Sequence, residues 1–110
     1  GIGDVGNVVM RDRHKLSEDG IIIVALTVEG GSNMLLSGPE VISRGFVYVK
    51  ESEDLIAEAR NVVLEAVESN LNKKNLDWNK LKNDIRDRLG GFVWKRTERR
   101  PMILPIIMEV

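Results

Sequence analysis

The stretch DGIIIVALTVEGG, residues 19–31, decides the fold. Its centre, residues 21–29, is rich in β-branched side chains and almost continuously apolar, which is typical of a strand buried on both faces. Asp19-Gly20 is a turn signal before this run, and the glycine-rich residues 30–33 after it are typical of a hairpin loop. The stretch therefore predicts the first strand of a buried sheet, followed by a return strand.

The return strand is expected in two pieces. Residues 34–37 begin it, and Gly38-Pro39 interrupts it. Residues 44–50 (RGFVYVK) then resume extended structure, with alternating apolar side chains.

Two helices are expected next. Apolar residues recur with a 3.6-residue period after Ser52, which predicts a first helix that ends near residues 70–75. Asp77 is a candidate N-cap for a second helix, which has a narrower apolar stripe. Gly90-Gly91 predicts the end of that helix, and residues 92–99 predict one or two further helical turns.

The last nine residues, 102–110 (MILPIIMEV), predict a closing strand. Pro105 lacks an N–H, so that position is expected at a sheet edge or a bulge. The whole pattern predicts an α+β fold in β-β-α-α-β order, in which a small sheet of about three strands is covered on one face by two helices. We expect a linker over residues 1–15 and one domain over residues 16–110.

The first six residues, GIGDVG, fit the spacing of a dinucleotide-binding loop. That loop needs a strand before it and a helix after it, whereas Gly1 begins the chain and residues 7–10 are typical of extended structure. Three glycines in six residues are more typical of a flexible connector. We therefore predict no bound cofactor here, and expect the chain to be a piece of a longer protein.

Residue types also argue against an active site. The chain has no cysteine and a single histidine, His14, which lies among charged residues in the expected linker. A metal site would therefore need several converging carboxylates, and no nucleophile motif is present. We predict no catalytic, cofactor-binding or metal-binding residue. The apolar runs are too short to cross a bilayer, so no membrane partner is expected.

Charge is unevenly distributed along the chain. Residues 51–70 hold six acidic residues and one basic residue, whereas residues 78–100 hold eight basic and three acidic ones. One interpretation is a surface for RNA phosphates, with Trp94 near enough to stack on a base. Its expected contacts are Lys95, Arg96, Arg99 and Arg100. The other interpretation is an acidic helix beside a basic one, within one subunit or between two.

Three stretches together carry a family resemblance. Residues 17–29 (SEDGIIIVALTVE), 42–56 (ISRGFVYVKESEDLI) and 98–110 (ERRPMILPIIMEV) resemble the C-terminal domain of bacterial ribonuclease J. Residues 1–16 (GIGDVGNVVMRDRHKL) resemble the connector that leaves the metallo-β-lactamase/β-CASP catalytic core of that family. The resemblance covers essentially the whole chain.

The resemblance implies a function as well as a fold. Ribonuclease J is implied to be a zinc-dependent, cytoplasmic enzyme of RNA processing and decay, with 5′-to-3′ exonuclease and endonuclease activities. Its catalytic and zinc-binding residues lie in the upstream core and match no position here. The C-terminal domain is implied to be non-catalytic and to support oligomer assembly and full activity.

The expected partners follow from that role. They are a second copy or a paralogous ribonuclease J subunit, RNA mainly through the core, and other RNA-decay proteins. An RNA-binding or partner-docking module that uses residues 95–100 is the alternative function.

Overall fold

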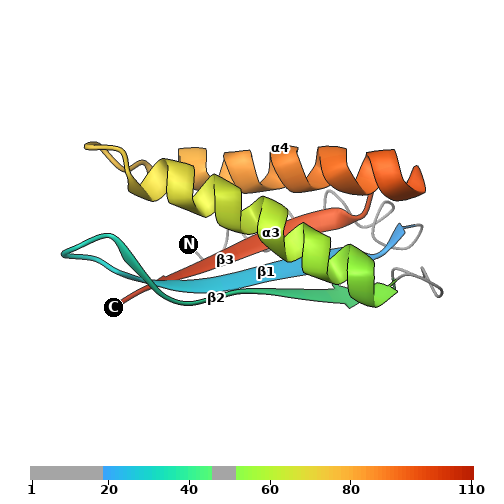
Figure 1. Ribbon diagram of the computed structural model, residues 1–110, viewed down its shortest axis with the longest axis horizontal. Helices are drawn as coiled ribbons and strands as arrows, with labels where there is room; N and C mark the ends of the chain where they lie inside the picture. The colour runs from blue at the N-terminus through green and yellow to red at the C-terminus, as the bar shows by residue number, and fades with distance from the viewer. Residues whose placement is uncertain (1–18, 46–51) are drawn as a thin grey trace, which may run out of the picture.

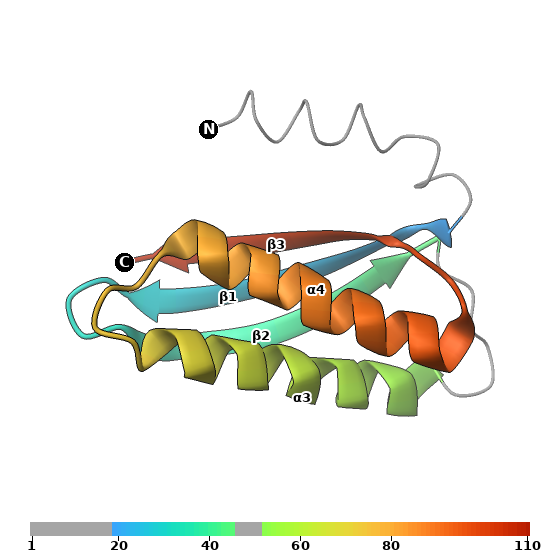
Figure 2. The same ribbon diagram turned by 90° about the horizontal axis from the view of Figure 1, so that it is seen from above.

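The computed structural model describes residues 19–45 and 52–110 (Figure 1). They form a three-stranded sheet with the strand order β2-β1-β3, together with two helices. The elements are β1 (Ile21–Glu29), β2 (Met34–Arg44), α3 (Ser52–Leu71), α4 (Trp78–Thr97) and β3 (Met102–Glu109). Both helices lie on one face of the sheet, side by side (Figures 1 and 2). The predicted α+β fold and its β-β-α-α-β order are confirmed.

The central strand, β1, is antiparallel to β2 and parallel to β3. Its even-numbered residues face the helices and are buried, because successive side chains of a strand point to opposite faces. The odd-numbered side chains, from Ile21 to Thr27, are half-buried on the other face. The expectation of burial on both faces is therefore wrong for the second face, since both helices cover the first one.

The core lies between β1 and the two helices. Fully buried side chains come from β1, α3 and α4 in similar numbers, with half-buried residues of β2 and β3 packed at its border. The inward residues are Ile22, Val24, Leu26 and Val28 from β1, Ala59, Val63, Ala66 and Val67 from α3, and Leu81, Ile85, Leu89 and Val93 from α4. Each large aliphatic side chain contributes about 1.5–3 kcal/mol when buried, so this layer dominates the stability of the fold.

Strand β2 continues through Gly38-Pro39, which corrects the prediction that this pair interrupts it. The pairing with β1 shifts register between Ala25 and Thr27, so the pair is accommodated as an irregularity within the ladder. Gly38 has a φ of +86°, which a glycine adopts easily. The predicted extended residues 44–50 lie outside the described residues from position 46 onward.

Helix α4 begins as predicted at its N-cap, Asp77, whose carboxylate accepts hydrogen bonds from the backbone N–H groups of Asn79 and Lys80. Its predicted end at Gly90-Gly91 is wrong, because the helix continues to Thr97. Each glycine costs about 1 kcal/mol in a helix. Leu89 and Val93 are fully buried on either side of the pair, and their packing outweighs that cost.

Strand β3 is an edge strand, so the expected edge position of Pro105 is confirmed. The N–H groups of Met102 and Val110 donate to the carbonyls of Gly20 and Val28, both at 3.0 Å. The N–H groups of even-numbered residues of β3 therefore point toward β1. The backbone nitrogen of Pro105, at an odd-numbered position, faces the free edge. The expected linker over residues 1–15, which includes His14, lies outside the described residues.

Candidate interaction surfaces

Side chains on the face of the sheet that the helices leave open form rows across the three strands. The strand registers align Glu40 with Ala25 and Ile106, then Ile42 with Ile23 and Leu104, then Arg44 with Ile21 and Met102. Paired residues in neighbouring strands point to the same face. The middle row is therefore entirely apolar, and each neighbouring row carries one charged residue on β2. A fourth row, Ser37 with Thr27 and Met108, lies beyond Glu40 on the same side. We call the nine residues of the first three rows the open face.

Exposure of this face increases along β3. Met102 is buried, Leu104 is half-buried, and Ile106 is 42% exposed. On the other edge strand, Ile42 is 37% exposed. The described residues include seven large exposed hydrophobic side chains, and six of them belong to β2, to β3 or to the residue after it: Met34, Leu36, Ile42, Ile106, Met108 and Val110. Such a concentration of apolar residues is typical of an interaction surface.

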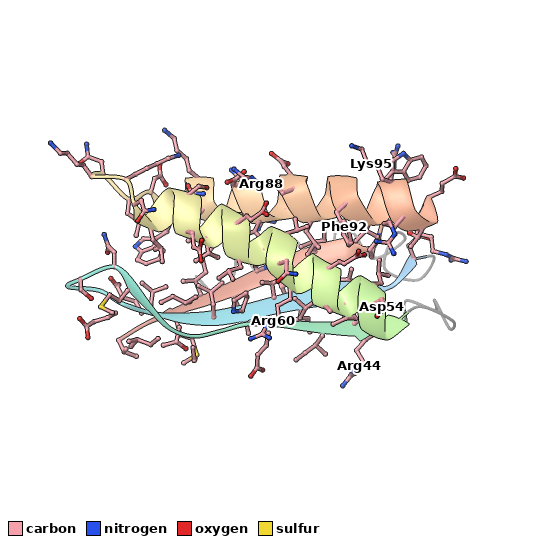
Figure 3. All side chains as sticks on the ribbon, in the orientation of Figure 1. Arg44, Asp54, Arg60, Arg88, Phe92 and Lys95 are labelled. Atoms are coloured by element: carbon pink, nitrogen blue, oxygen red, sulfur yellow. The ribbon has the colours of Figure 1, made fainter. Side chains whose placement is uncertain are left out.

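Two opposite charges flank Ile42 on β2. Glu40 and Arg44 are exposed, and Arg44 points away from the helices (Figure 3). The Arg44 guanidinium donates a 2.9 Å hydrogen bond to the Ser43 carbonyl, whereas the Glu40 carboxylate forms no hydrogen bond or salt bridge within residues 19–45 and 52–110. Four residues of strand separate the two charges by about 13 Å, which is too far for a salt bridge between them. Both charges therefore remain available to a partner.

Both edges of the sheet contain a proline. Pro39 lies within β2 and Pro105 within β3, and neither position can donate a hydrogen bond to an added strand. The Pro39 carbonyl is also occupied, because the Arg60 side chain on α3 donates to it at 2.8 Å. Prolines in edge strands protect a sheet against edge-to-edge pairing. The face, rather than either edge, is therefore the surface best suited to a partner.

The four predicted RNA contacts gather near the C-terminal end of α4, but intramolecular contacts engage three of them. Arg96 forms a salt bridge with Glu58 of α3 and lies over the Phe92 ring. Arg99 pairs with Asp19 at 3.9 Å. The Arg100 guanidinium stacks 4.5 Å from the centroid of the Trp94 ring.

Lys95 differs from the three arginines. It is exposed on the side of α4 away from the sheet (Figure 3), and its ammonium group forms no hydrogen bond or salt bridge with the residues that the structure describes. Trp94 beside it is 42% exposed. The four predicted RNA contacts, which we call the basic cluster, are thus partly neutralised by acidic residues of the same domain. The salt bridge from Arg96 to Glu58 matches the interpretation of an acidic helix beside a basic one. Lys95 and the open face lie on opposite sides of the molecule.

A small cleft of about 220 Å³ lies between the start of α4 and the end of β3, lined by Trp78, Lys82, Ile107 and Glu109. Across residues 19–45 and 52–110, no three His, Cys, Asp or Glu side chains gather as metal ligands would. No helix in this part of the chain is long and apolar enough to cross a membrane.

Comparison with known proteins decides the family. The Ribonuclease J C-terminal domain family matches residues 8–110. The chain belongs to this family. It is 50% identical over 110 residues to Ribonuclease J 2 of Staphylococcus aureus (strain NCTC 8325 / PS 47) and 51% identical over the same length to Ribonuclease J2 of Bacillus subtilis (strain 168). Both matches cover the whole chain but 20% of the relative, so this ribonuclease J domain spans about a fifth of their length.

The rows of the open face could have been partly foreseen. Residues 40–44 (EVISR) alternate between the two faces, with Glu40, Ile42 and Arg44 on one side and Val41 on the core side. Gly38-Pro39 concealed this alternation, because the pair indicated a break just before it. The pairing of the arginines with acidic residues carried no local signal, since Asp19 and Glu58 are distant in sequence.

Proposed function

We propose that this ribonuclease J C-terminal domain is a non-catalytic assembly module, which supports oligomer formation and thereby full activity of the parent enzyme. The observation that carries the proposal is the open face, whose middle row is apolar across all three strands. A soluble domain rarely exposes such a contiguous apolar surface unless a partner covers it. The expected partner is another ribonuclease J subunit, either identical or paralogous.

Catalysis belongs, in this proposal, to the part of the parent outside the chain. That part would hold the zinc ions and the 5′-to-3′ exonuclease and endonuclease activities. The described residues do not fit zinc, because they bring no group of three ligating side chains together. We therefore assign no step of RNA cleavage to this domain.

RNA binding at the end of α4 is the second candidate function. The exposed Trp94 and the unengaged Lys95 support it, because an aromatic ring and a nearby cation can stack on a base and contact a phosphate. The engagement of three arginines within the domain weakens it. This candidate uses the side of the molecule opposite the open face, so one experiment can separate the two.

The test is a truncation of a full-length ribonuclease J that carries this domain, ending before Glu18. We expect fewer subunits per particle by light scattering coupled to size exclusion, after allowance for the mass of the removed domain, together with a loss of RNA cleavage and an unchanged zinc content. Interfaces that persist usually bury about 1,200 Å² or more, so removal of the open face should shift the mass clearly. An unchanged number of subunits with unchanged activity would contradict the proposal. An unchanged number of subunits with weakened, salt-sensitive RNA binding would favour the second candidate.

A further inference from the structure

The rows of the open face are self-complementary in charge. On β2, Glu40 and Arg44 lie two residues on either side of Ile42, and the register places all three on the same face. A two-fold axis that runs across the strands along the row Ile42, Ile23 and Leu104 would reverse the strand direction of the second copy. That operation places Arg44 of one copy over Glu40 of the other, and the reverse pair forms by symmetry.

We propose that the occupant of the open face is a second copy of this domain, packed face to face about that axis. This inference rests on the proposed assembly function and specifies its partner and geometry. Three features of the chain favour it over other occupants. The axial row is apolar, the flanking charges are opposite in sign, and the prolines at both edges disfavour assembly by sheet extension.

The open face has an apolar centre and a charged rim, as protein interfaces commonly do. Two sheets that pack face to face lie about 10 Å apart and interdigitate the side chains of their inner faces. Ile42, Ile23 and Leu104 would meet their own copies at the axis, and the exposed Ile106 would add apolar surface beside it. The charged pairs would lie on the β2 side, at the solvent-accessible rim, where opposite charges fix register more than they add affinity.

The symmetry makes a charge-swap test possible. Glu40→Arg alone places two arginines opposite each other at both rim sites, and Arg44→Glu alone places two glutamates there. The double variant E40R/R44E restores two opposite-charge pairs with their positions exchanged. Sedimentation velocity of the 110-residue chain over a range of concentrations measures the dimer dissociation constant of each variant.

We expect each single variant to weaken the dimer about tenfold or more, since like charges in contact are strongly unfavourable at an interface. The double variant should return close to the original dissociation constant, and high salt should reduce all these differences. Lys95→Glu, on the opposite side of the molecule, is the control and should leave the dimer unchanged.

Two results would overturn the inference: a monomeric chain at every concentration, or a dimer that the two single variants leave unchanged. Either result leaves the proposed function open to its own test, because truncation of the full-length enzyme would still lower the number of subunits per particle. In that case the open face would contact the remainder of the parent. If truncation also leaves the number of subunits unchanged, both proposals fail together.

Discussion

Gly38 shows how one residue shapes the edge of the sheet. Its φ is +86°, and a Cβ at this position would lie 2.6 Å from the carbonyl oxygen of Ala25 on the neighbouring strand. Both features favour glycine, because it alone lacks the side chain that would collide. The irregularity held by Gly38 precedes Glu40, Ile42 and Arg44, so it sets which face those three residues occupy.

Gly38→Ala should destabilise the domain by about 1–3 kcal/mol, through backbone strain and the collision with Ala25. Gly31→Ala is the matched control, since a Cβ there would meet no atom within 4 Å. Urea unfolding monitored by circular dichroism measures both variants. Equal stabilities for the two variants would show that the conformation of Gly38 does not constrain β2.

At the scale of elements, a buried polar network joins the two helices. Asn70, near the end of α3, is buried and donates 2.8 Å hydrogen bonds to the Ala66 carbonyl and to the Asp84 carboxylate on α4. Arg88 donates to the other oxygen of that carboxylate at 2.9 Å. Because a buried amide needs its partners, this network fixes how α3 and α4 pack along their length.

Asn70→Ala should cost about 1–3 kcal/mol of unfolding free energy, since it removes the hydrogen bonds that the buried amide donates to the Ala66 carbonyl and to the Asp84 carboxylate. Asn83→Ala on α4 is the matched control. Asn83 is exposed and its side chain accepts one hydrogen bond from Arg86, so its loss should cost less than about 0.5 kcal/mol. Thermal unfolding of both variants gives the comparison, and a similar cost at the two sites would count against the network.

The elements that the sequence predicted well are those with strong local signals. The apolar run of β1, the stripe of α3 and the Asp77 cap each indicate their structure without distant contacts. The two errors about where elements break, at Gly38-Pro39 and at Gly90-Gly91, have one physical origin. In both places a local preference for a break is outweighed by tertiary packing: the ladder with β1 in the first, and buried Leu89 and Val93 in the second.

At the scale of the whole molecule, both helices lie on one face of the three-stranded sheet, and no other described helix or strand covers the opposite face (Figure 1). The basic cluster could be predicted as a set of residues, but its engagement could not, because the acidic partners come from other elements. The open face required the strand order, since only the register aligns Ile42 with Ile23 and Leu104. The most apolar surface thus emerges from topology rather than from any one segment.

The measurement that tests the central claim most directly is the oligomeric mass of a full-length ribonuclease J that carries this domain with Ile42→Asp and Ile106→Asp. Carboxylates at these exposed positions should disrupt an apolar interface, because burying an unpaired charge is strongly unfavourable. Ala57→Asp, exposed on α3, adds the same charge on the helix side as the control. We predict that the double variant loses mass by light scattering while its zinc content stays unchanged and the control keeps its mass. An unchanged mass in the double variant would contradict the account.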